Sequence, residues 1–167
     1  MPEPLKPRNR ARLREKDAAR LRAAVEAHFG VAPWPEGAHV DRANTHEGDV
    51  LLLGGHIIGF FQPAEPEARL VPTVRVLLAG SPGKSFVTVD MGAVPFVHKG
   101  ADIMGPGIVE ADPNLQVGDL LWVRDERNRR PLAVGEALVP GAEMPKQPGK
   151  KVRNLHRVGD LFWTWEG

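Results

Sequence analysis

The Gly-Lys-Ser sequence at 83–85 suggests chemistry, because the same three residue types end the phosphate-binding loop of many nucleotide hydrolases. That loop needs a further glycine five residues earlier, where this chain has Leu78, and Gly80 comes two residues too late. The loop must also open a helix whose backbone amides hold the phosphates, whereas residues 85–90 alternate like a strand. We therefore expect residues 80–84 to be a linker and not a nucleotide site.

Other reactive groups are absent or scattered. The chain has no cysteine, so it has neither a disulfide framework nor a thiolate nucleophile or metal ligand. No Ser-His-Asp or paired-carboxylate arrangement follows from the spacing. The histidines never pair at helical ligand spacing, so we expect no metal site and no cofactor. Their positions are His28, His39, His46, His56, His98 and His156.

Basic residues are concentrated at the N-terminus. Residues 1–22 have a net charge of +5 in a chain whose formal net charge is +1, which leaves −4 for the remainder. Lysine and arginine displace counterions from phosphates, so such an arm is typical of polyanion-binding proteins. It is equally typical of a solvated, fraying terminus.

The chain of 167 residues, 42% of them hydrophobic, can bury a core as one domain or two small ones. No stretch approaches the roughly 18 apolar residues of a membrane helix, and the basic N-terminus lacks the apolar run of a secretory signal. We expect a cytoplasmic protein without a membrane partner.

The first half combines one helix with several strands. Apolar residues at helical spacing predict an amphipathic helix over 15–29, which Gly30 ends. Gly54-Gly55 predicts a tight hairpin, because glycine reaches the positive φ values of such turns. The expected strands cover 38–43, 49–53, 56–62 and 73–80.

The second half has short strands separated by turn residues, with one helical segment over 93–98. Six short strands in about 80 residues are typical of a compact barrel. We therefore predict an α+β protein with two domains, 1–83 and 84–167. The expected strands of the second are 85–90, 107–111, 119–125, 132–139, 150–156 and 160–165.

Residues 90–109 contain Lys99-Gly100 and then Gly105-Pro106-Gly107. Glycines let a backbone approach a ligand closely, and their amides are available as hydrogen-bond donors. With the charge of Lys99 beside them, they suit the phosphodiester of RNA. An ordinary barrel connection explains the same residues equally well.

A cationic stripe lies between Met144 and Gly159, where there are five basic residues and no acidic one. It indicates either an anion-binding surface or an edge strand that lysines protect against aggregation. The stripe consists of Lys146, Lys150, Lys151, Arg153 and Arg157.

Two further groups have a structural interpretation. Beside Asp125 and Glu126 in a predicted hairpin tip, we expect local ion pairing of Arg127, Arg129 and Arg130. Aromatic side chains in alternating contexts favour core packing or barrel closure over base stacking. They are Trp122, Phe162, Trp163 and Trp165.

Residues 85–165 resemble a PUA domain, the small RNA-binding pseudobarrel found in pseudouridine synthases and archaeosine transglycosylases. The resemblance is carried by VDMGAVPFVHKGADIMGPGI, VGDLLWVRDERNRRPLAVGEAL and GKKVRNLHRVGDLFW. The preceding GGHIIGFFQPAEPEARLVPTVRVLL is similar to the N-terminal domain of the malignant-T-cell-amplified-sequence family. That family includes the yeast translation-machinery-associated relatives, the front of ligatin and short archaeal homologues. The chain resembles an archaeal member.

The resemblance implies a pre-PUA α+β domain followed by a PUA domain, and binding without catalysis. It implies an RNA partner, either the tRNA 3′ region or ribosomal RNA, in translation initiation or ribosome recycling. Further partners would be the small ribosomal subunit and a SUI-type protein. An alternative is an accessory PUA subunit that assists a tRNA-modifying enzyme in trans.

The resemblance also assigns site residues. Lys99, Lys151 and Arg153 would neutralise phosphates, the glycines would allow close approach, and Met104 would face an unstacked base. Asp102 would accept a hydrogen bond from the RNA or, as we favour, cap the loop. The implied RNA-binding residues are His98, Lys99, Gly100, Ala101, Asp102, Met104, Gly107, Lys151 and Arg153.

Overall fold

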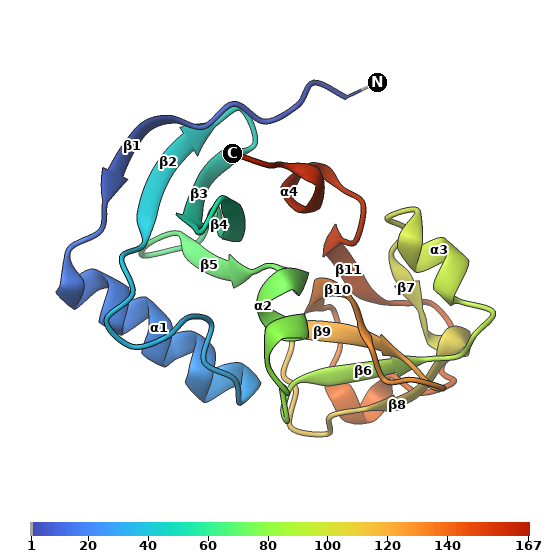
Figure 1. Ribbon diagram of the computed structural model, residues 1–167. Helices are drawn as coiled ribbons and strands as arrows, with labels where there is room; N and C mark the ends of the chain where they lie inside the picture. The colour runs from blue at the N-terminus through green and yellow to red at the C-terminus, as the bar shows by residue number, and fades with distance from the viewer. Residues whose placement is uncertain (1) are drawn as a thin grey trace. The chain divides into compact units, whose positions relative to one another are not determined.

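A computed structural model describes residues 2–167 and divides the chain into two compact units (Figure 1). The first unit contains the residues up to Ser81 together with Leu161–Gly167, and the second contains Pro82–Asp160. The division expected from the sequence placed the last seven residues with the second half. As a division into functional domains, 1–83 and 84–167 stays a prediction.

The first unit is built on a five-stranded antiparallel sheet in the order β1-β2-β3-β4-β5. The hairpin expected at Gly54-Gly55 is confirmed, because both glycines have positive φ, 59° and 79°, between β3 and β4. The strands are β1 (Arg8–Arg12), β2 (Asp41–Thr45), β3 (Gly48–Leu53), β4 (His56–Gln62) and β5 (Arg69–Pro72).

Helix α1 covers Glu15–Phe29 and ends at Gly30, whose φ is 75°, as the sequence predicts. The expected strand over 73–80 is wrong, because Val74–Ala79 forms the short helix α2. Val74 and Leu77 lie three residues apart on one helical face, and both are fully buried. No helix among residues 2–167 combines the length and the apolar character that crossing a membrane requires.

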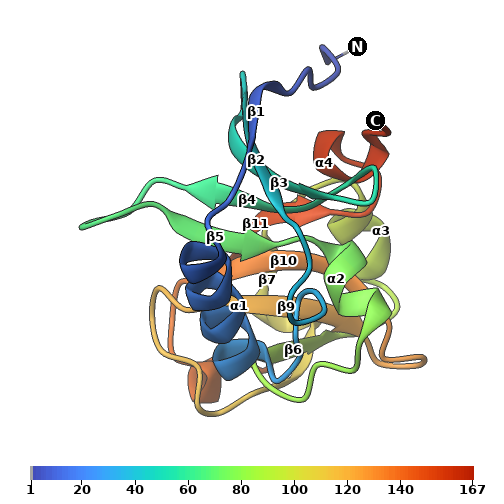
Figure 2. The ribbon, with the colours of Figure 1, turned by 60° about the vertical axis from the view of Figure 1, so that its left-hand side comes forward.

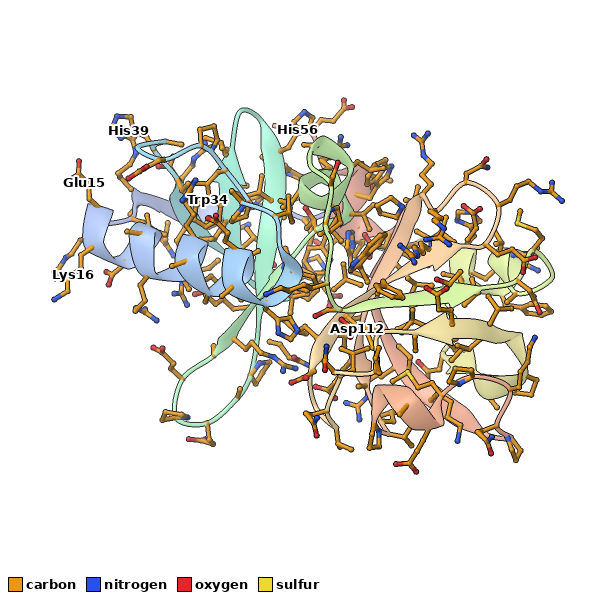
Figure 3. The ribbon with its side chains drawn as sticks, turned by 90° about the horizontal axis from the view of Figure 1, so that it is seen from below. Glu15, Lys16, Trp34, His39, His56 and Asp112 are labelled. Carbon is orange, nitrogen blue, oxygen red and sulfur yellow. The ribbon has the colours of Figure 1, made fainter. Side chains whose placement is uncertain are left out.

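Part of the basic N-terminal arm is folded as edge strand β1, which runs along β2 (Figure 2). Arg10 and Arg12 both donate to the carboxylate of Asp41, at 2.7 and 2.9 Å. These hydrogen bonds, first that of Arg12, lower the pKa of Asp41. Glu15 and Lys16, labelled in Figure 3, are exposed at the start of α1.

The C-terminal residues pack on the first unit. The strand expected over 160–165 is wrong, since Leu161–Thr164 forms helix α4. Phe162 stacks on Phe60 with ring centroids 4.3 Å apart, and the Arg75 guanidinium lies 4.4 Å from the centre of a Trp163 ring. The chain therefore leaves the first unit after Ser81 and returns to it at Leu161.

The second unit is a six-stranded sheet in the order β7-β11-β10-β9-β6-β8, in which only the β6–β9 pair is parallel among the residues described. It encloses an apolar core that includes Val89, Ile108, Leu121 and Met144. Helix α3 (Val94–His98) and the 3₁₀ turns η1 (Gly105–Gly107) and η2 (Gly141–Glu143) complete it. The strands are β6 (Phe86–Val89), β7 (Ile103–Met104), β8 (Ile108–Ala111), β9 (Leu120–Asp125), β10 (Pro131–Ala137) and β11 (Lys150–Arg157). The predicted α+β class with a β pseudobarrel is confirmed.

The Gly-Lys-Ser sequence at 83–85 enters strand β6 and no helix. Buried Asp112, labelled in Figure 3, accepts the backbone N–H of Ser85 at 2.7 Å. The indole N–H of Trp122 donates to the carbonyl of Lys84 at 2.8 Å. This segment therefore anchors the first strand of the second unit and does not form a phosphate-binding loop.

Replacing Phe162 by alanine removes the ring that stacks on Phe60, and we expect the first unit to lose about 1–2 kcal/mol of unfolding free energy. Urea unfolding followed by circular dichroism measures this loss. Glu166→Ala, at an exposed position of the same tail, is the matched control. Equal midpoints for the two variants would show that the tail does not stabilise the first unit.

Candidate nucleic-acid interface

An open groove of about 430 Å³ lies on the second unit and is lined by residues of α3, β7 and η1 and by the segment that precedes α3. Its walls are mostly apolar. The lining residues are Asp90, Gly92, Ala93, Phe96, Val97, Asp102, Ile103, Met104, Pro106 and Gly107. The groove contains three of the residues that the resemblance assigns to RNA, namely Asp102, Met104 and Gly107.

Two large apolar side chains of the groove are exposed. Phe96 of α3 is 62% exposed and Met104 of β7 is 48% exposed, while their neighbours Val97 and Ile103 are buried in the core. Exposing an aromatic ring and a thioether side by side leaves apolar surface in water. Such a surface can hold an unstacked base, because every base has an apolar face.

The residue Phe96 was missed by the sequence reasoning, which assigned it only to a short apolar helix. A five-residue helix can bury only one face, and the buried residue on that face of α3 is Val97. The signal that was available is the length of the helix: Val94, Phe96 and Val97 lie within five residues, and one face of so short a helix cannot bury all three.

The glycine-rich segment lies directly beside the late basic strand. Met104 is paired with Lys150 and Ile103 with Val152, and Lys151 is the extra residue of a β-bulge between them. The amide of Gly105 donates to the carbonyl of Gly149 at 2.8 Å. The segment that contributes Met104 to the groove and the basic strand β11 are therefore neighbours in one sheet.

The glycines of this segment serve the fold more than expected. A Cβ at Gly105 would overlap the carbonyl oxygen of Gln147, and a Cβ at Gly100, whose φ is 86°, would lie 2.8 Å from Nε of Arg157. The amides of Gly100 and Gly105 are bonded within the protein, to Val97 and Gly149. The expectation that these amides are available to a ligand is wrong for these two glycines.

Asp102 ties the loop to β11. Its Oδ1 accepts the backbone N–H of Asn154 at 2.9 Å, and its Oδ2 lies 3.0 Å from Nζ of Lys150. The hydrogen bond from Asn154, followed by that from Lys150, holds the pKa of Asp102 below its ordinary value. Asn154 completes the connection through its side-chain amide, which donates to the carbonyl of Ala101 at 3.1 Å.

The cations around the groove differ in their partners. His98 and Lys99 are exposed at the end of α3, and Lys151 is half-buried with its Cε close to Gly105. Among residues 2–167, neither Lys99 nor Lys151 has a carboxylate within ion-pair distance. Arg153 is exposed and lies 3.8 Å from Glu136, on the outer face of β11 because Val152 is buried.

No group of three or more His, Asp or Glu side chains within residues 2–167 is arranged to hold a metal ion. The two acidic groove residues are both engaged by the protein. Asp90 Oδ1 accepts the N–H of Ala93 at 2.9 Å, and Asp102 is bound as described above. Their charges are thus partly compensated before any anion approaches.

The second unit, which has this sheet order, is a PUA domain. Residues 86–159 match the family model described as "PUA domain".

The chain is similar over nearly its whole length to a protein of Methanocaldococcus jannaschii, "Uncharacterized protein MJ1432", with 36% identity over 96% of this chain and 98% of that protein. It is 29% identical to human "Malignant T-cell-amplified sequence 2" over 83% of this chain and 81% of the relative. It is 28% identical to yeast "Translation machinery-associated protein 20" over 64% of this chain and 61% of the relative.

The fold is similar to the crystal structure of a hypothetical protein, PH0734.1 from Pyrococcus horikoshii, with a TM-score of 0.77, 30% identity and coverage of 92% of this chain and 97% of that one. The chain belongs to the family of the malignant-T-cell-amplified-sequence and translation-machinery-associated proteins. Its membership and its PUA domain support RNA binding in translation. None of the relatives described here has the name of an enzyme.

Replacing Asp102 by asparagine tests the charge that ties the loop to β11. Because the folded pKa of Asp102 lies below its ordinary value of 3.8, the carboxylate contributes stability above that pH, which is lost as the pH falls through the folded pKa. Its side chain is 31% exposed, so solvent screening limits the contribution to less than about 1 kcal/mol.

As the pH is lowered from about 5 to about 2, we therefore expect the unfolding free energy of the Asp102→Asn variant to fall less than that of the parent protein. Urea unfolding at several pH values measures this difference, with Glu143→Gln, at an exposed carboxylate, as the control. Parallel pH profiles for the parent protein and Asp102→Asn would contradict the assigned role.

Proposed function

We propose that the groove of the second unit binds single-stranded RNA, with bases against Phe96 and Met104 and phosphates near Lys99, Lys151 and Arg153. The observation that carries this proposal is that the exposed side chains of Phe96 and Met104 line one groove, and that β7, which contains Met104, is paired with the basic strand β11. A single strand offers both unstacked base faces and phosphates, whereas a duplex hides the faces of its bases.

The three cations play unequal parts in this proposal. Lys99 and Lys151 have no carboxylate partner among residues 2–167, so a phosphate meets their full charge. Arg153 must weaken its 3.8 Å contact with Glu136, which is a loose, exposed ion pair that costs little to give up. His98 is exposed beside Lys99 at the end of α3 and offers a further polar contact.

The RNA that fits this surface is one with an unpaired end, and we propose the 3′ region of tRNA, with ribosomal RNA as the other possibility. The role would be in translation initiation or ribosome recycling, on the small ribosomal subunit and beside a SUI-type partner. The names of the relatives, which include a translation-machinery-associated protein, support this role.

Reversing the charges at Lys99 and Arg153 tests the RNA-binding surface. We expect the Lys99→Glu/Arg153→Glu variant to bind tRNA at least about tenfold more weakly, with a slope of log affinity against log salt that is about 1.4 smaller, because two phosphate contacts are lost. Filter binding at several salt concentrations measures both quantities. Removing the unpaired 3′ nucleotides of the tRNA should weaken binding by the parent protein in the same assay.

The control for this experiment is Lys84→Glu, which reverses an exposed lysine at the start of β6, outside the groove lining. A folded double variant that binds tRNA like the control would exclude this surface as the RNA site.

The translation role has a separate test. We expect the protein in a cell extract to sediment with the small ribosomal subunit, and to leave that fraction when Lys99 and Arg153 are reversed. Co-purification with a tRNA-modifying enzyme and absence from the subunit fraction would contradict the role and favour an accessory function in RNA modification.

A further inference from the structure

The β9–β10 hairpin ends in an exposed cationic tip, residues 126–130, which can be followed from the end of β9 in Figure 1. Arg127, Arg129 and Arg130 are all exposed. The sequence predicted local ion pairing of these arginines with Asp125 and Glu126. That prediction is wrong: none of the three arginines has an ion-pair partner among residues 2–167.

The reason is that Asp125 is used by the backbone. It is buried, and its Oδ1 accepts the N–H groups of Arg127 and Asn128 at 2.9 and 2.6 Å, so its carboxylate shapes the turn. Glu126 alone remains as an exposed acid within the tip, against three arginines. The tip therefore holds a surplus of positive charge on a fixed turn.

A second observation agrees with uncompensated charge at the tip. Arg124 is the second-last residue of β9. Its pKa is lowered first by burial and then by repulsion from Arg129. The guanidinium of Arg124 itself contacts Glu110 at 3.2 Å and donates to the hydroxyl of Thr88 at 2.9 Å, so its charge has acceptors within the protein. The outer arginines have no comparable acceptor within the part of the chain described.

The tip lies close to one of the residues that line the groove. The backbone N–H of Glu126 donates to the carbonyl of Val89 at 2.9 Å, and the next residue, Asp90, lines the groove. Met104, another residue of the groove lining, is paired with Lys150, and Lys151 follows Lys150 in β11. Two different lining residues, Asp90 and Met104, thus have basic segments beside them, while no basic residue is part of the lining itself.

We propose that the tip residues Arg127, Arg129 and Arg130 form a second phosphate-binding site for the same RNA, which the strand reaches after leaving the groove at Asp90. This inference rests on the proposed function and extends it to the length and path of the RNA. Arginine suits the role, because its planar fork of donors binds phosphate oxygens in pairs. An RNA that only fills the groove does not reach the tip, whereas a longer strand does.

The path makes RNA length the test. Two labelled oligouridylates, of about 4 and about 16 nucleotides, cover the range of strand lengths that small single-strand-binding folds accommodate. The variants are Arg127→Glu and Arg130→Glu, each made singly. Arg129 is left unchanged, because its left-handed φ of 55° makes it part of the turn geometry itself.

We expect each variant to bind the long oligouridylate about three- to tenfold more weakly than the parent protein, with a smaller salt slope, and to bind the short one unchanged. Lys84→Glu, with the same change of charge at the opposite end of β6, is the matched control and should affect both lengths equally. Because all three positions are exposed, melting temperatures should stay close to that of the parent protein.

The outcomes separate the two proposals. If the parent protein binds neither oligouridylate, the proposed RNA-binding function itself fails. If the parent protein binds both, but the tip variants bind the long strand as Lys84→Glu does, the groove stays an RNA site and the tip is excluded from the path. An equal loss for the short and the long strand would also overturn the inference, because it would indicate a general charge effect.

Discussion

The pairing of β7 with β11 is the constraint on which the candidate site depends, because it brings a glycine-rich segment and a basic strand to one surface. It consists of only two residues on the β7 side, and a strand this short is not stable alone. Asp102 supplements it by accepting the N–H of Asn154 and contacting Lys150, and Asn154 returns a hydrogen bond to Ala101. The pair therefore behaves as one cross-braced unit.

This bracing explains why the groove can present apolar surface to water. Val97 and Ile103 are buried in the core, so α3 and β7 are fixed and their neighbours Phe96 and Met104 are forced outward. A binding surface that is held in place before the ligand arrives loses little conformational entropy on binding. The cations of the neighbouring segments then supply attraction over a longer range than the apolar contacts, and that attraction depends on salt.

Much of the fold could be predicted from the sequence, and the failures have physical causes. The helix over 15–29 was predicted to the residue, because its apolar spacing and Gly30 are strong local signals. Residues 73–80 were misassigned, since a short run of β-branched and apolar residues suits a strand or a buried helix alike. The positions of Phe96 and of the tail at Phe162 depend on tertiary packing, which local patterns do not encode.

The measurement that tests the central claim most directly is the affinity of a short oligouridylate for Phe96→Ala, compared with Val117→Ala. Phe96 and Val117 are 62% and 63% exposed, so neither change should affect folding, and only Phe96 lines the groove. If bases stack in the groove, Phe96→Ala should lose about 1–3 kcal/mol of binding free energy, while Val117→Ala binds like the parent protein. Equal affinities for the two variants would contradict the account, because RNA would then bind without using the groove.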